Sequence, residues 1–239
     1  MPDPNSTSLI AFRDWTLRVR ESTSPSPRLM LLVHGLTGDE NSMWVFARNL
    51  SPDYWMVAPR AHHPSQMEQG GYTWRESEPG QEDRPNLTEL RVSAEALIRL
   101  VDDYAASIGV DASTFDVMGF SQGAAMCSLL AFLYPHRIRK VGMLAGFVPS
   151  GLETLASQRP LEGKPVFVAH GTKDETVTIE NARASLEILE KAGAQVTFCE
   201  DDVGHKVSAS CLRALKDFFK DTRSTPRSGS VDTRSSPVD

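Results

Sequence analysis

Cysteine is scarce in this chain. The 239 residues include three cysteines, Cys127, Cys199 and Cys211, which lie far apart and form no Cys-x-x-Cys pair. An odd number of widely spaced cysteines argues against a disulfide framework and against a zinc site. We therefore expect each cysteine to pack as a small apolar side chain, and we expect a reducing, cytoplasmic compartment.

Long apolar segments and basic clusters are missing as well. No apolar run approaches the roughly 20 residues that span a bilayer, so we expect no stable membrane insertion. Residues 1–8 contain neither a basic region nor an apolar core, and we expect no signal peptide. The 25 lysines and arginines are outnumbered by 31 aspartates and glutamates, and the net charge of −6 argues against a nucleic-acid partner.

The composition is that of an ordinary globular protein. Apolar residues make up 40% of the chain and charged residues 23%, which allows one sizeable core. We predict a single domain over residues 1–220. Residues 221–239 are rich in Ser, Thr, Pro and Arg without apolar periodicity, and we expect a disordered polar tail there.

One short segment has the pattern of a nucleophile elbow. The segment Gly119-Phe120-Ser121-Gln122-Gly123 follows a strand-like apolar run, 115–118, and precedes a helix-like apolar run, 124–133. Strand, sharp turn and helix is the context that the Gly-x-Ser-x-Gly motif requires. The two glycines remove bulk where strand and helix approach each other. The pattern predicts that Ser121 is a nucleophile at the edge of a sheet.

Apolar runs alternate with helical segments along the rest of the chain. The continuous apolar run 29–33 is typical of a strand buried on both faces of a parallel sheet. Further strands are predicted for residues 54–58, 115–118, 141–145, 166–170 and 196–199, which are largely apolar. Helices are predicted for residues 41–50, 88–108, 124–133, 179–192 and 209–220. The alternating segment 12–20 predicts one antiparallel edge strand.

This order predicts the α/β class and an α/β-hydrolase fold, in which helices cover both faces of a mostly parallel central sheet. The connection 146–165 is too short for an inserted subdomain. We therefore expect no large cap domain and an open groove.

Three residues that could form a catalytic triad each follow a predicted strand, in the order Ser121, Asp174, His205. The α/β-hydrolases use this order, and strand ends of a parallel sheet meet at one edge. His205 would take the serine proton, and Asp174 would orient the imidazole ring. Asp201 and Asp202 remain alternatives for the acid because they lie close to His205 in sequence.

Two backbone amides are candidates for an oxyanion hole. In the α/β-hydrolase plan, one donor lies in the loop after an early buried strand, and the other belongs to the residue after the nucleophile. Here these are the amides of Leu36 and Gln122.

Aromatic residues indicate where a substrate could bind. Tyr72 and Trp74 lie in the long segment 59–85 and are interpreted either as a wall of the substrate groove or as anchors of an ordered surface loop. Trp44, near the start of a predicted helix, is a further candidate contact. The adjacent histidines 62 and 63 lack a neighbouring ligand pattern, so we expect no metal site.

Four segments together resemble the phospholipase/carboxylesterase family, which includes the acyl-protein thioesterases. They are LVHGLTGD at 32–39, GFSQGA at 119–124, HGTKDETV at 170–177 and GHKVS at 204–208. The resemblance covers roughly residues 28–220 and implies a compact, cofactor-free, often cytoplasmic hydrolase. It also implies that Ser121, Asp174 and His205 form the triad, that Leu36 and Gln122 form the oxyanion hole, and that Val177 borders the acyl site. Ala124 and the segment 59–85 depart from the family pattern, so the resemblance does not specify the substrate.

These features predict a serine carboxylesterase that hydrolyses short- to medium-chain carboxylic esters through an acyl-enzyme, with thioesters as a further candidate class of substrate. Its partner would be a small-molecule acyl ester, and a homodimer is possible. One alternative is a dienelactone-hydrolase-like enzyme, although that family carries cysteine where this chain has Ser121. A second alternative is a non-catalytic ligand-binding protein on a hydrolase scaffold.

Overall fold

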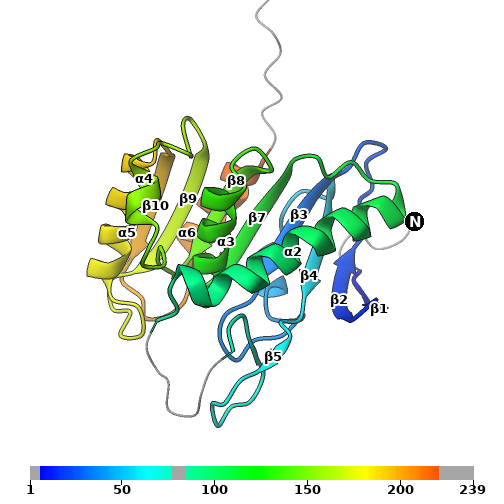
Figure 1. Ribbon diagram of the computed structural model, residues 1–239, viewed down its shortest axis with the longest axis horizontal. Helices are drawn as coiled ribbons and strands as arrows, with labels where there is room; N and C mark the ends of the chain where they lie inside the picture. Colours follow the sequence, from blue (N-terminus) through cyan, green and yellow to red (C-terminus); the bar gives the residue numbers. More distant parts are fainter. Residues whose placement is uncertain (1–5, 77–83, 221–239) are drawn as a thin grey trace, which may run out of the picture.

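The computed structural model describes residues 6–76 and 84–220. The predicted tail, 221–239, lies outside the described residues. An eight-stranded sheet runs through the molecule in the order β1-β2-β4-β3-β7-β8-β9-β10 (Figure 1). Its strands are β1 (Ser8–Phe12), β2 (Trp15–Arg20), β3 (Arg28–Val33), β4 (Tyr54–Pro59), β7 (Phe115–Phe120), β8 (Ile138–Leu144), β9 (Pro165–Gly171) and β10 (Gln195–Asp201).

Six neighbouring strands of the sheet, β4, β3, β7, β8, β9 and β10, pair in parallel. At one side of the sheet, β1 pairs antiparallel with β2, and β2 pairs antiparallel with β4. The prediction of a mostly parallel sheet is therefore confirmed. The expected single strand over residues 12–20 is wrong, because the chain turns at Arg13, which has a φ of 53°. The alternating pattern continues across this turn, and so the sequence alone did not reveal the hairpin.

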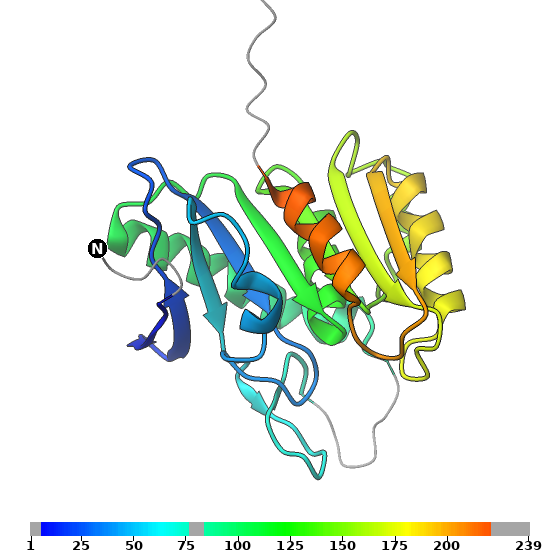
Figure 2. The same ribbon diagram turned by 180° about the vertical axis from the view of Figure 1, so that it is seen from behind.

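Helices cover both faces of the sheet (Figures 1 and 2). One face carries α2 (Leu87–Ile108), α3 (Gln122–Leu133), α4 (Glu153–Ala156) and α5 (Ile179–Lys191), and the other carries α1 (Trp44–Ala47) and α6 (Ala209–Phe219). Within β3, Leu29 and Leu31 pack on the first face while Met30 and Leu32 pack on the second. Two-sided burial is the reason that the run is continuously apolar.

Local signals set the helix boundaries well in one case and poorly in another. Helix α2 begins at a capping box formed by Asn86 and Glu89, and it ends at Gly109, whose φ of 68° is left-handed. The prediction of this helix is confirmed. Helix α1 has four residues, whereas the sequence predicted a helix over 41–50. A short hairpin, β5 (His63–Pro64) with β6 (Tyr72–Thr73), lies in the long segment that follows β4.

A disulfide joins Cys199 to Cys211, and the expectation that all three cysteines are unpaired is wrong. The two residues are 12 apart in sequence, but α6 packs back against β10 and places their Cα atoms 5.7 Å apart, a distance that a disulfide can bridge. Cys127 is a free, buried cysteine of α3. Burial raises the pKa of its thiol well above the usual value, and Cys127 packs as a small apolar side chain, as predicted.

Candidate active site

The segment around Ser121 has the strained geometry of an elbow. Ser121 connects β7 to α3 with a φ of 52° and a ψ of −118°, a backbone conformation that is costly for a residue with a side chain. Its amide donates to the Leu144 carbonyl at 2.8 Å, which ties the elbow to β8. A Cβ added to Gly123 would lie 2.0 Å from the Val33 carbonyl oxygen. The close approach of α3 to β3 therefore requires glycine at this position.

Asp174 and His205 are joined by a hydrogen bond. The Nδ1 of His205 lies 2.7 Å from Oδ2 of Asp174, and the Asp174 side chain is fully buried. The other carboxylate oxygen, Oδ1, accepts from the amides of Thr176 and Val177, each at 2.9 Å. One oxygen is thus fixed by the backbone of the turn after β9, and the second holds the imidazole ring.

The competing carboxylates bond elsewhere. Asp202 is exposed and pairs with Lys173 at 2.8 Å, and Asp201 accepts from the Ser210 hydroxyl. Asp116, the second residue of β7, accepts from Tyr54 and Arg139 inside the protein. Geometry therefore favours Asp174 over its neighbours as the partner of His205.

His205 lies next to the elbow. Its ring centroid is 5.0 Å from that of Phe120, the residue before Ser121, and 24% of its side chain is exposed. Among the described residues, no hydrogen bond links Ser121 Oγ to the His205 ring. Catalytic hydrogen bonds are often long in ligand-free structures and shorten when substrate binds. The structure thus joins Asp174, the predicted acid, to His205, the predicted base. It also places His205 against β7, the strand that leads to Ser121.

The loop after β3 lies against Ser121. A Cβ on Gly35 would be 3.3 Å from the Cβ of Ser121, so this loop and the elbow are in direct contact. In the part of the chain that the structure describes, neither the Leu36 amide nor the Gln122 amide donates a hydrogen bond to another residue. Both donors remain free for a ligand oxygen, as an oxyanion hole requires.

A buried histidine holds this loop, a role that the sequence alone did not predict. The Nε2 of His34 accepts from the Ala61 amide at 3.0 Å, so the proton is on Nδ1, which donates to the Gly35 carbonyl at 2.7 Å. Burial lowers the pKa of His34 from 6.5 to about 4, and the ring is therefore neutral at pH 7. The sequence feature that could have indicated this role is the position of His34 at the end of a strand, directly before a glycine.

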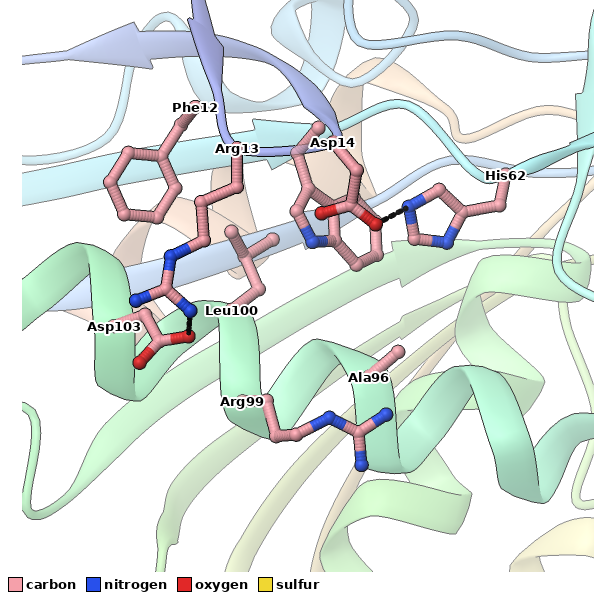
Figure 3. Close-up of a pocket in the computed structure, with 9 residues that line it drawn as sticks. Phe12, Arg13, Asp14, His62, Ala96, Arg99, Leu100 and Asp103 are labelled. Atoms are coloured by element: carbon pink, nitrogen blue, oxygen red, sulfur yellow. Dashed lines mark hydrogen bonds and ion pairs between the residues drawn. The ribbon is translucent and has the colours of Figure 1, made fainter.

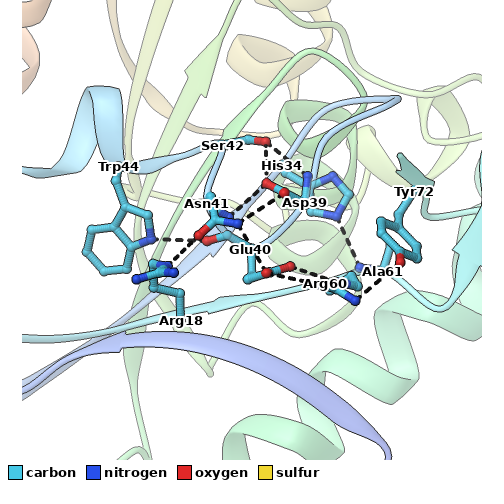
Figure 4. Close-up of polar contacts among 10 residues, drawn as sticks. All are labelled: Arg18, His34, Asp39, Glu40, Asn41, Ser42, Trp44, Arg60, Ala61 and Tyr72. Carbon is cyan, nitrogen blue, oxygen red and sulfur yellow. Dashed lines mark hydrogen bonds and ion pairs between the residues drawn. The ribbon is translucent and has the colours of Figure 1, made fainter. Parts of the chain in front are cut away.

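A second polar network supports the same loop (Figure 4). Buried Glu40 accepts two hydrogen bonds from Arg60, at 2.7 and 2.9 Å, and these bonds hold the pKa of Glu40 below its usual value. Arg60 also donates to the Tyr72 hydroxyl at 3.2 Å. The Trp44 indole donates to the Glu40 carbonyl at 3.0 Å. Tyr72 and Trp44 are thus fixed, half-buried, around the segment that follows the candidate oxyanion loop.

Two of the predicted substrate contacts are core residues. Trp74 is 1% exposed and its indole donates to the His34 carbonyl at 2.8 Å. The Gln122 side-chain oxygen accepts from the Trp74 amide at 3.0 Å, so the elbow itself holds this segment. The ring of Trp74 is buried beneath the loop, which favours the alternative interpretation of this residue as an anchor of an ordered segment. Val177 is 3% exposed and packs in the core below the Asp174 turn.

A cavity of about 160 Å³ lies elsewhere, between the β1–β2 turn and the middle of α2 (Figure 3). His62 lines it, with its ring tilted against that of Trp15 at a centroid distance of 3.9 Å and its Nε2 3.5 Å from the Asp14 carboxylate. The cavity contains none of the predicted site residues. Over residues 6–76 and 84–220, no group of three or more His, Cys, Asp or Glu side chains is placed to hold a metal ion. Within the same ranges, no helix has the length and apolarity needed to cross a membrane.

Comparisons with known proteins show which proteins this chain resembles. Carboxylesterase SOBER1 from Arabidopsis thaliana is 29% identical over 126 residues, which are 52% of this chain and 55% of that protein. The chain thus matches about half the length of this relative. Acyl-protein thioesterase 1 from Debaryomyces hansenii is 27% identical over 227 residues, covering 86% of this chain and 95% of that one.

Solved structures share the fold. A carboxylesterase from Mesorhizobium loti superposes with a TM-score of 0.74 at 22% identity, covering 89% of this chain and 97% of the other. The α/β-hydrolase prediction is confirmed by this neighbour and by the sheet described above. The family described as phospholipase/carboxylesterase matches residues 16–223, which is most of the chain. The protein therefore belongs to the phospholipase/carboxylesterase family.

Proposed function

We propose that this protein is a serine carboxylesterase that hydrolyses short- to medium-chain carboxylic esters and thioesters through an acyl-enzyme. The observation that carries the proposal is the 2.7 Å hydrogen bond between His205 and buried Asp174, beside a serine on a strained elbow. The names of the relatives, carboxylesterase and acyl-protein thioesterase, support the same reaction class.

The proposed reaction begins with Ser121. Its hydroxyl oxygen attacks the acyl carbon while His205 Nε2 accepts the hydroxyl proton. Asp174 keeps the other ring proton on Nδ1 and stabilises the resulting imidazolium. The amides of Leu36 and Gln122 bind the oxyanion of the tetrahedral intermediate, and the loss of one such donor typically costs about 3 kcal/mol. His205 then protonates the departing alcohol or thiol, and the acyl group stays on Ser121.

Deacylation repeats these steps with water. The oxygen of a water molecule attacks the acyl-enzyme while His205 accepts a proton from that water. His205 returns the proton to Ser121 when the carboxylic acid leaves. The substrate would lie near Leu36, Trp44 and Tyr72. Leu36 is 43% exposed, and both aromatic side chains are half-buried. A small acyl group of the substrate would pack against these partly exposed apolar side chains.

The proposal is tested by hydrolysis of p-nitrophenyl acetate, butyrate, octanoate and palmitate, and of butyryl-coenzyme A. We expect the parent protein to hydrolyse the shorter esters and Ser121→Ala to be inactive. Ser113→Ala is the matched control, because Ser113 is an exposed serine just before the start of β7, whose far end leads into the elbow. A fluorophosphonate probe should label the parent and the control but not Ser121→Ala. An unlabelled, inactive parent would instead support a ligand-binding protein.

A further inference from the structure

The loop that carries His205 is closed at its base by a covalent bond. Cys199 lies in β10 and Cys211 lies in the first turn of α6. Their disulfide spans a sequence separation of 12 residues, and His205 is at the middle of that span. The candidate base is thus the central residue of a small covalent ring.

Packing alone holds this loop weakly. Every residue from 202 to 208 keeps part of its surface exposed, whereas Asp174 is 4% exposed. Two of the backbone hydrogen bonds near His205 are local, from Val203 to Asp201 at 2.8 Å and from Lys206 to Gly204 at 2.7 Å. A loop with few buried contacts depends on its ends for its position.

The two ends of the loop are held differently. The first half is attached to the turn after β9, where the Lys173 amide donates to the Val203 carbonyl at 3.0 Å. The second half leads into α6, whose N-terminus is capped by Ser208 and anchored by buried Cys211. Cys211 belongs to the apolar core cluster on the face of the sheet that carries α1 and α6, and both Cys199 and Phe120 pack against that cluster. The ring of Phe120 in turn lies against His205. The disulfide therefore fixes the second half of the loop to the layer on which the His205 ring rests.

We propose that the Cys199–Cys211 disulfide is a positioning crosslink for His205, so that turnover depends on the oxidation state of this pair. The inference rests on the proposed function for its kinetic test only. Reduction by a dithiol transfers two electrons and two protons to the pair. A thiolate of the reductant attacks the sulfur of Cys199, the less buried residue of the two, and the Cys211 sulfur leaves and takes a proton. The second thiolate then displaces Cys199, which gives two protein thiols and one cyclic disulfide of the reductant.

The experiment compares the oxidised parent, the parent reduced with dithiothreitol, and the double variant Cys199→Ser/Cys211→Ala. Mass spectrometry after alkylation verifies the number of thiols. The measurements are kcat and KM for p-nitrophenyl butyrate, the thermal midpoint, and amide hydrogen exchange of residues 202–208 and of α2. Dithiothreitol added to the double variant controls for other effects of the reagent.

We expect reduction and the double variant each to lower kcat by roughly 10- to 100-fold, because a base displaced by about 1 Å loses that much. KM should change less than twofold. Exchange should rise in 202–208 and stay unchanged in α2. The proposal is overturned if the fully reduced protein keeps its kcat, or if activity falls only in step with unfolding and exchange rises throughout the sheet. Loss of folding by both forms at the assay temperature would also overturn it, since the disulfide would then hold the whole fold.

The failure of the proposed function can be told apart from the failure of this inference. If the oxidised parent neither hydrolyses esters nor reacts with a fluorophosphonate, the esterase proposal fails. The exchange measurement still tests the crosslink in that case, because it reports on the loop without turnover. If the oxidised parent is active and the reduced protein is equally active, the positioning role alone is wrong.

Discussion

Acidification should destabilise this protein through His34. Burial lowers the pKa of His34 to about 4 in the folded protein, whereas an imidazole in an unfolded chain has a pKa of ~6.5. Between these values the unfolded chain binds more protons, so stability falls as the pH falls. The contribution is fully present above pH ~6.5, is lost progressively down to pH ~4, and is constant below that. Protonation also removes the lone pair that accepts from the Ala61 amide.

The magnitude follows from the two pKa values. At 1.36 kcal/mol per pKa unit, the difference between ~6.5 and ~4 corresponds to about 3 kcal/mol of unfolding free energy. Other groups titrate in the same range, and so the informative quantity is the difference between the parent and His34→Gln. Urea denaturation at pH 7, 6, 5 and 4 measures it. We expect His34→Gln to be less stable than the parent at pH 7 and the gap to close by about 3 kcal/mol at pH 4.

The control is His136→Gln, because His136 is exposed and should leave the pH dependence of the parent unchanged. Stability curves of the parent and of His34→Gln that run parallel from pH 7 to pH 4 would refute the reasoning. The ring of His34 would then be charged in the folded state or accessible to water. Neither condition fits its two hydrogen bonds and its 1% exposure.

Three further predictions concern the site. In ester hydrolysis, Asp174→Asn should lower kcat by roughly 10³- to 10⁴-fold, because an amide group facing His205 Nδ1 favours the wrong tautomer. The control variant Asp202→Asn should keep its kcat within twofold of the parent's. A kcat of Asp174→Asn within tenfold of the parent's would contradict the role of Asp174. Gly123→Ala should lose about 3 kcal/mol or fail to fold, because its methyl group meets the Val33 carbonyl; an unchanged urea midpoint would contradict it. Glu40→Gln should lower the free energy of unfolding by about 1–3 kcal/mol, because it leaves Arg60 without its charged partner. Urea denaturation measures this change. A free energy of unfolding equal to the parent's would show that the ion pair contributes little.

Local patterns in the sequence determined most of the strands and helices. The apolar run of β3 is continuous because both of its faces are buried, and the run by itself was enough to predict a buried strand. Helix α2 was predicted with its terminal Gly109 because capping depends on neighbouring residues. The elbow around Ser121 was equally clear, since strand, turn and helix are consecutive in the chain.

Tertiary structure decided whatever depends on residues that are far apart in sequence. The Cys199–Cys211 bond forms because α6 folds back onto β10, and neither spacing nor composition shows that return. The choice of Asp174 over Asp202 as partner of His205 depends on the direction of side chains at the edge of the sheet. Trp74 is in the core because β6 and the elbow meet over His34. A sequence records the preferences of each segment, but packing between segments determines which side chains face each other.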